Sequence, residues 1–228
     1  IHTDIGLRRI EDLEIGDLVL SKNPNSKQQI LTPVTAVRKI DEAPIVQIKV
    51  SFETADAAES EHFALAGLPC FFVSGIDPQY PEDEKSELSH LLGWQEIRKI
   101  DSMLRIHSLA DPHAYLWSVK QVWKSKAPSI GWAELSRNSD FCYPIEFRGD
   151  GTLLARPKTI MHDLVEGRTH LNRHESSRIA NELAMRHTVH SIEVEGNLPY
   201  FVGSHGICVL PVANWNLSEV WAHERIWE

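Results

Sequence analysis

The fold of this chain is decided by residues 3–21, which run TDIGLRRIEDLEIGDLVLS. The spacing predicts a strand that turns at Gly6, a short amphipathic turn, a second tight turn at Gly16 and Asp17, and then an apolar strand. Glycine suits both turns because it adopts positive φ without steric cost. Asp17 is expected to accept backbone hydrogen bonds within its own turn. The chain therefore opens as a β-meander.

Length and charge limit the classes of protein that this chain can be. Its 228 residues suffice for one all-β body with a sizeable core and an insertion. No apolar run approaches the roughly 18 residues that a membrane span needs. The net charge of −9 disfavours a nucleic-acid partner, because binding a polyanion relies on clustered Lys and Arg. We therefore expect no membrane span and no nucleic acid.

Two further segments carry a strand pattern with glycine turns. The middle one comprises residues 65–75, LAGLPCFFVSG, followed by residues 93–101, GWQEIRKID. The last one comprises residues 190–196, HSIEVEG, and residues 200–209, YFVGSHGICV. With residues 3–21 they make three ordered blocks, which together resemble the first, middle and final blocks of the Hint superfamily, the hedgehog and intein modules. The resemblance is strongest to the pre-toxin Hint-like domains of bacterial secreted polymorphic toxins.

The resemblance implies a mostly β fold, with a horseshoe-shaped, all-β Hint-like body, an α/β insertion and a short C-terminal helix. Residues 1–124 and 187–212 would form the body, and residues 125–186 the insertion, with a helix near residues 169–185. Residues 213–228 would be an amphipathic tail that either covers this body or docks another. Within the body, the alternating residues 113–124 predict a strand, whereas the polar stretches 51–62 and 74–89 predict exposed loops.

Self-cleavage in the Hint family implies three sets of groups. A Cys or Ser upstream of the first block attacks the preceding carbonyl, a Thr-x-x-His pair in the middle block polarises that amide, and a terminal His-Asn pair can cleave by cyclisation. The nucleophile position lies upstream of Ile1 and outside this chain. With residues 71–73 setting the register, Ala66 and Pro69 occupy the Thr and His positions. Leu210 and Pro211 occupy those of His-Asn.

None of these four side chains donates or accepts a hydrogen bond, and Pro211 has no amide to cyclise. No catalytic position of the family is therefore intact. In an alternative register His62 is the middle histidine, with Glu59 at the Thr position, but residues 71–73 are then unexplained.

A metal site is the other chemistry that the sequence raises. His162, His170 and His174 form its densest cluster of metal-type side chains, and His170 and His174 would share one face of a helix. A hydrolytic site needs three ligands, an open position and usually a carboxylate, such as Asp163 or Glu175. The His-Glu-x-x-His arrangement is absent from the sequence. We assign no metal and no cofactor, and interpret the cluster as solvated surface.

The remaining cysteines and histidines are interpreted as structural. Three unevenly spaced cysteines in apolar surroundings favour small buried hydrophobes over a disulfide framework. A lone histidine beside a strand is usually a hydrogen-bonded structural residue. These residues are Cys70, Cys142, Cys208, His2, His187, His190 and His205, with Ser191 as an equally weak candidate.

Three functions follow from these observations. The first is a catalytically degenerate Hint module that serves as a structural or partner-docking domain of a larger secreted or toxin polypeptide. The second is an active autoproteolytic or splicing domain, working by an N–S/O acyl shift, whose nucleophile lies outside this chain. The third is a metal-dependent hydrolase centred on the insertion. We favour a non-enzymatic role, with other domains of the same polypeptide or a protein as partner. By resemblance, the location would be the bacterial cytoplasm before export, or secreted.

Overall fold

The computed structural model makes the chain mostly β, which confirms the predicted fold class. It describes residues 1–23, 28–53, 58–66, 70–96, 100, 104–109, 114–125, 127–134, 141–147, 153–155, 159–160 and 184–210. Within these ranges the strands form two antiparallel sheets, and α1 (Glu82–Leu88) is the α-helix.

The larger sheet has twelve strands and holds all three of the blocks that resemble Hint sequences. Its main path runs in the order β15-β4-β9-β8-β6-β17-β16-β3-β1-β2, with β5 beside β4 and β7 beside β6. The strands are β1 (His2–Thr3), β2 (Gly6–Leu7), β3 (Leu18–Lys22), β4 (Gln29–Glu53), β5 (Ala58–Ala66), β6 (Cys70–Ile76), β7 (Gly93–Glu96), β8 (Leu104–Ile106), β9 (Ala114–Gln121), β15 (Arg186–Val194), β16 (Tyr200–Val202) and β17 (Ile207–Leu210). Short 3-10 turns are η1 (Ile10–Asp12), η2 (Ser89–Leu91) and η4 (Glu195–Asn197).

The first block folds as its sequence predicts. Gly6 has a φ of 106° and closes the β1–β2 hairpin opposite Thr3. Gly16 has a φ of 98°, and the next residue, Asp17, accepts the backbone N–H of Glu14 at 2.8 Å. Asp17 also accepts a hydrogen bond from Arg8 at 2.7 Å. The aspartate therefore has the local structural role that we expected.

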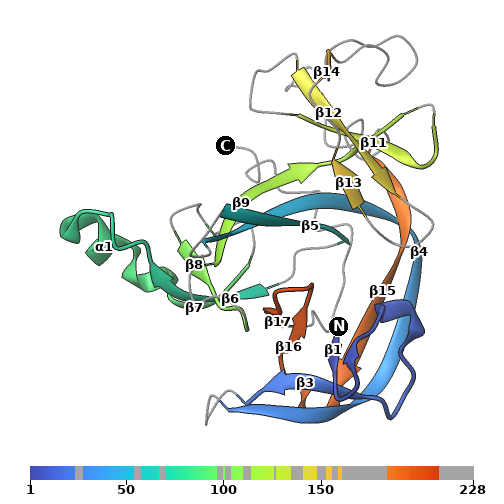
Figure 1. Cartoon of the computed structure of the whole chain (residues 1–228), viewed down its shortest axis with the longest axis horizontal. Coiled ribbons are helices and arrows are strands. Elements are labelled where there is room, and N and C mark those ends of the chain that lie inside the picture. Colours follow the sequence, from blue (N-terminus) through green and yellow to red (C-terminus); the bar gives the residue numbers. More distant parts are fainter. Residues whose placement is uncertain are drawn as a thin grey trace.

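β4 is the long strand around which the main sheet is built. Its 25 residues pair in turn with β3, β15, β5 and β9. The strand curves from the β3 end of the molecule to the β5 and β9 end, which gives the sheet an open, curved outline (Figure 1). Because one side-chain face of a strand repeats every second residue, Val46, Ile48, Val50 and Phe52 all enter the main core.

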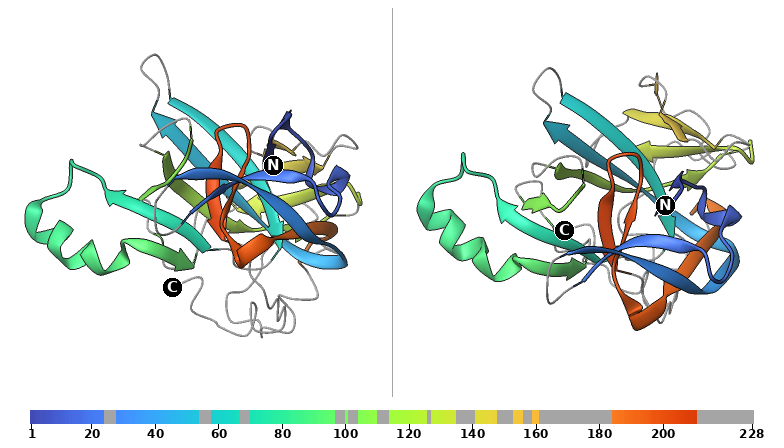
Figure 2. Two further views of the ribbon diagram at one scale, coloured as in Figure 1. Left: turned by 90° about the horizontal axis from the view of Figure 1, so that it is seen from below. Right: turned by 60° about the horizontal axis from the view of Figure 1, so that its bottom comes forward.

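Two predicted loops are wrong in part. Residues 51–62 were expected to form an exposed loop, but residues 51–53 continue β4 and residues 58–62 belong to β5. The reason is tertiary, because Phe52 is fully buried in the core and pairing with β9 holds the polar residues around it in the strand. The stretch 74–89 contains the end of β6 and all of α1. α1 lies between β6 and β7 at one edge of the molecule (Figure 2), and its last residue, Leu88, packs against the main core.

The predicted insertion contributes four strands of a second, five-stranded sheet, and the end of the predicted body contributes the fifth. The strands are β10 (Trp123–Lys124) from the body and β11 (Ile130–Glu134), β12 (Phe141–Phe147), β13 (Leu153–Ala155) and β14 (Thr159–Ile160) from the insertion. A small core of its own joins it to the main sheet, since Ile45 of β4 packs with Val122, Ala133 and Ile145. The predicted C-terminal tail and residues 169–183 of the predicted helix lie outside the described residues. The last two residues of the predicted helix are described and are not helical, because Ala184 forms a β-bridge with Trp123 and Met185 packs in the small core.

No helix among the described residues is both long and apolar enough to cross a bilayer.

Candidate functional site

The middle and final blocks meet where β6 pairs with β17. Val209 opposes Phe71, and Leu210 opposes Cys70, in an antiparallel register. Residues 69 and 211, which the resemblance singled out, each adjoin a member of the last pair in sequence. The fold thus brings together the middle and final blocks of the sequence, from segments about 140 residues apart in the chain (210 minus 70).

The family positions themselves are only partly described. Leu210 is half-buried at the end of β17, and Ala66 is the last residue of β5. Pro69 and Pro211 lie outside the described residues. The alternative candidate, His62, lies within β5, where its backbone pairs with that of Lys49.

The metal candidates His162, His170 and His174 also lie outside the described residues. Within the described ranges, no group of three or more His, Cys, Asp or Glu side chains is arranged to hold a metal ion.

A buried lysine and a buried thiol lie near the junction of the blocks. Lys22, at the end of β3, is only 8% exposed, and its Nζ lies 4.5 Å from the centre of the Phe72 ring. Cys208 is fully buried in β17. Burial raises the pKa of the Cys208 thiol to about 12, although the positive charge of Lys22 opposes this rise. Because the thiolate is the nucleophilic form, Cys208 is inert at neutral pH.

His107 contacts both of the blocks that meet at this junction. Its ring lies 6.1 Å from that of Phe72 in the middle block and 6.0 Å from that of Phe201 in the final block. Its backbone also joins the two blocks, because its N–H donates to the carbonyl of Phe72 at 2.8 Å and its carbonyl accepts the N–H of Cys208 at 3.0 Å. Burial, and after it the positive charge of Lys22, lowers the pKa of His107. The ring is therefore neutral at pH 7 and able to accept a proton.

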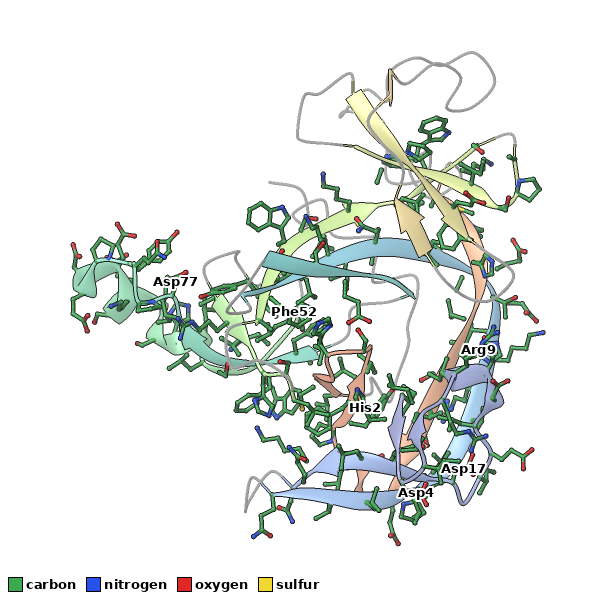
Figure 3. All side chains as sticks on the ribbon, viewed as in Figure 1. His2, Asp4, Arg9, Asp17, Phe52 and Asp77 are labelled. Carbon is green, nitrogen blue, oxygen red and sulfur yellow. The ribbon has the colours of Figure 1, made fainter. Side chains whose placement is uncertain are left out.

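A second cluster joins the β16–β17 turn to β5 and β4. The carboxylate of Glu61 accepts the backbone N–H of Ser204 at 2.8 Å, and its other oxygen lies 3.2 Å from Nδ1 of His205. The His205 ring stacks on Phe52 with 3.9 Å between the ring centres and 16° between the planes. Figure 3 shows His2 beside the β16–β17 hairpin and Phe52 on the side of that hairpin nearer β4 and β5. We call Glu61, Ser204, His205 and Phe52 the turn clamp.

The geometry of the turn clamp suits anchoring rather than proton relay. The hydroxyl of Ser204 lies 3.0 Å from Nδ1 of His205, the same ring nitrogen that faces Glu61. A Ser-His-carboxylate relay needs the hydroxyl and the carboxylate at opposite ring nitrogens. The serine and the glutamate here compete for one nitrogen. The turn clamp therefore fixes the position of the turn.

The other histidines near the blocks also make structural contacts. Nε2 of His2 lies 2.7 Å from the carbonyl of Gly203, which ties the first block to the turn of the final block. His187 stacks on Phe147 with 5.4 Å between ring centres, which ties β15 to the small sheet. His190 and Ser191 lie within β15, in the part that pairs with β4. These contacts agree with the structural interpretation of His2, His187 and His205.

Sequence reasoning missed Lys22, Glu61 and His107. A lysine that ends an apolar strand and a glutamate within a polar stretch both have the sequence pattern of solvated residues. His107 directly follows β8, whose residues alternate, and its place at the end of a strand was the only sequence feature that could have marked it as a site residue. The cysteines were predicted better, since Cys208 is buried and Cys70 half-buried, and both are free thiols.

Comparisons with known proteins add little to this picture. No family model matches the sequence, and no curated protein matches it either. Among solved structures, the solution structure of a bacterial intein-like domain from Clostridium thermocellum is similar, with a TM-score of 0.42 and 14% identity over 93% of each chain. The fold class of this chain therefore rests on its own strands and their pairing.

Proposed function

We propose that this chain is an intein-like, Hint-type module that has lost its self-cleaving groups and serves as a structural or partner-docking domain of a larger secreted or toxin polypeptide. One observation carries the proposal, namely the pairing of β6 with β17 that sets Leu210 against Cys70. In a working module this junction would hold a histidine from the middle block and a His-Asn pair from the final block. Here the sequence supplies Pro69, Leu210 and Pro211 instead.

The groups around the junction support the same proposal. Cys208 has a pKa raised by burial and supplies no thiolate at neutral pH. The turn clamp uses its histidine and carboxylate to anchor a turn. Losing one positioned donor commonly lowers the rate of acyl transfer by about 100- to 1,000-fold. The loss of several independent groups leaves the upstream junction stable.

The test is to express the chain with its natural upstream flank and to follow the junction on denaturing gels, with and without added thiol. We expect the precursor to stay intact under both conditions. A matched variant carries Ala66→Thr, Pro69→His, Leu210→His and Pro211→Asn, which restores the family groups. Cleavage at the upstream junction in the unmodified chain would contradict the proposal.

The active alternative is favoured by one observation. His107 has a lowered pKa and lies between aromatic rings of the middle and final blocks. If the module cleaves itself, His107 is the described histidine best placed to act as its base. The same gel assay on His107→Gln tests this. If the unmodified chain cleaves and the variant does not, His107 is assigned as the base. If the unmodified precursor stays intact, there is no reaction for His107 to assist.

A further inference from the structure

The face of the main sheet that points away from the main core carries cations and aromatic rings. Along β4, Val46, Ile48, Val50 and Phe52 enter the core, so Lys49 and Ser51 between them lie on the opposite face. By the same alternation, Arg105 of β8 lies on this face, because its neighbours Leu104 and Ile106 are buried. We call this surface the outer face and define it by Lys49, Ser51, Ser60, Arg105, Tyr115, Trp117, Ser118 and Lys120.

The strand register makes the outer face continuous. Ser51 of β4 opposes Ser60 of β5 on one side and Tyr115 of β9 on the other, and Tyr115 opposes Arg105 of β8. In the adjacent row, Lys49 opposes Ser118. Across these four strands the row therefore has two small side chains, on β5 and β4, followed by two long ones, on β9 and β8.

Trp117 projects from this surface because β9 is bulged there. The register of β9 against β4 shifts between Lys49 and Val50, which oppose Ser118 and Leu116, so that Trp117 has no residue directly opposite it. A β-bulge re-aims the side chain of its extra residue. Trp117 is 62% exposed, which is unusual for the largest apolar side chain. An exposed tryptophan on a rigid sheet is a typical anchor for a protein partner.

Two cations of the outer face lie over its aromatic rings. Nζ of Lys49 lies 5.3 Å from the centre of the Trp117 ring. Arg105 lies over Tyr115, with 5.8 Å from its Cζ to the ring centre, and its Nε donates to the tyrosine hydroxyl at 3.1 Å. Lys120, further along β9, is half-buried and opposes Gln47, which is fully buried. Lys49 and Arg105 thus lie on the same face as the exposed Trp117, in a chain whose net charge is −9.

We propose that the outer face binds an acidic segment of a protein partner, with Trp117 as its apolar anchor and Lys49 and Arg105 as its electrostatic complement. Opposite charge on the partner supplies orientation and speeds association. A nucleic acid fits this face less well, because sequence-independent binding of single strands uses several exposed rings in succession. Among the residues that define the outer face, Tyr115 is only 7% exposed, so Trp117 is the one ring that offers a stacking surface.

The proposal rests on the docking role proposed above, but it does not depend on the loss of self-cleavage. The test begins with a displayed library of random dodecapeptides selected against the immobilised protein. We expect enriched peptides to be acidic and to contain an apolar residue. The peptides are then synthesised, and their Kd is measured at low and moderate salt by fluorescence polarisation.

Two variants and one control locate the binding surface. Trp117→Ala is expected to weaken the Kd by at least about tenfold, as for an interface anchor. Lys49→Glu is expected to weaken it comparably and to reduce its dependence on salt. Lys39→Glu makes the same charge change at an exposed position elsewhere on β4 and should leave the Kd within about twofold. Thermal melts check that each variant is folded.

Several results would overturn the proposal. These are a selection without enrichment, enrichment of basic or neutral peptides, or acidic peptides that bind Trp117→Ala and Lys49→Glu as tightly as the unmodified chain. Binding of oligo-deoxythymidine that is lost in Trp117→Ala, without acidic peptides, would assign the face to nucleic acid instead. Cleavage of the upstream junction is measured separately. If the chain cleaves itself and also binds acidic peptides through Trp117 and Lys49, the loss of self-cleavage is contradicted and the docking surface is not.

Discussion

Replacing Glu61 with alanine tests whether the turn clamp holds the final block in place. The variant removes the acceptor for the N–H of Ser204 at 2.8 Å and the partner of His205 at 3.2 Å. A longer contact with the backbone N–H of His205, at 3.4 Å, is lost as well. The two donors of the turn are then left without the acceptor that now satisfies them.

The expected cost follows from the number and burial of these bonds. Hydrogen bonds to a charged group contribute about 1.5–3 kcal/mol. The Glu61 side chain is 21% exposed, so that water replaces part of what is lost. We expect Glu61→Ala to lower the free energy of unfolding by about 2 kcal/mol. For a chain of this size that corresponds to a Tm lower by about 4–8 °C.

The assay is urea denaturation at neutral pH, with Glu61→Gln and Glu82→Ala as comparisons. Glu61→Gln keeps an oxygen for the Ser204 N–H but loses the charge, and should cost about 1 kcal/mol. Glu82 is 89% exposed on α1, and its replacement should change stability by less than about 0.5 kcal/mol. If Glu61→Ala unfolds at the same urea concentration as Glu82→Ala, the turn clamp does not stabilise the fold.

Three further predictions use other described residues. Gly206→Ala should lower the free energy of unfolding by at least about 2 kcal/mol, because the φ of Gly206 is +66° and an added Cβ would lie 2.5 Å from a methyl carbon of Leu109. Gly6 also has a positive φ but has open space around it, so Gly6→Ala should lower the free energy of unfolding by about 1 kcal/mol in the same urea titration. Because the pKa of His107 is lowered in the folded chain, the unfolded chain binds more protons below its ordinary value of 6.5, so stability should fall as the pH drops from 6.5 toward the folded pKa. His107→Gln should flatten that slope in melts between neutral and mildly acidic pH, and an unchanged slope would contradict the assignment. Cys208 should react with a thiol reagent only after unfolding, since its pKa is about 12, and Cys208→Ser should therefore remove one slowly reacting thiol without changing the fast phase.

The sequence predicted the elements whose signal is local. The turns at Gly6 and Gly16 need positive φ, and glycine supplies it wherever the rest of the chain lies. Asp17 accepts a backbone hydrogen bond from a residue three positions away, so its role also follows from short-range geometry. β9 was predicted from its alternating residues. In each case the neighbouring residues contain all the information that the structure uses.

The errors lie where the decisive contact comes from far along the chain. Residues 51–62 are polar enough to predict a loop, but burial of Phe52 and pairing of β4 with β9 and β5 keep residues 51–53 and 58–62 in strands. The sequence does not mark Glu61 as an anchor, because its partners lie more than 140 positions away. Lys22 has the pattern of a surface lysine, yet the packing of Phe72 against it leaves it 8% exposed.

By itself the sequence determined the mostly β class, the order of the three blocks and the side chains Ala66, Pro69, Leu210 and Pro211 at the positions that the resemblance singled out. Only the tertiary structure decided that the middle and final blocks are neighbours, that a neutral histidine lies between them, and that Lys49 and Arg105 share one sheet face with an exposed tryptophan. The physical reason is that turns and strand alternation are set by adjacent residues. Burial, pKa and surface charge are set instead by strands that meet in space from distant parts of the chain.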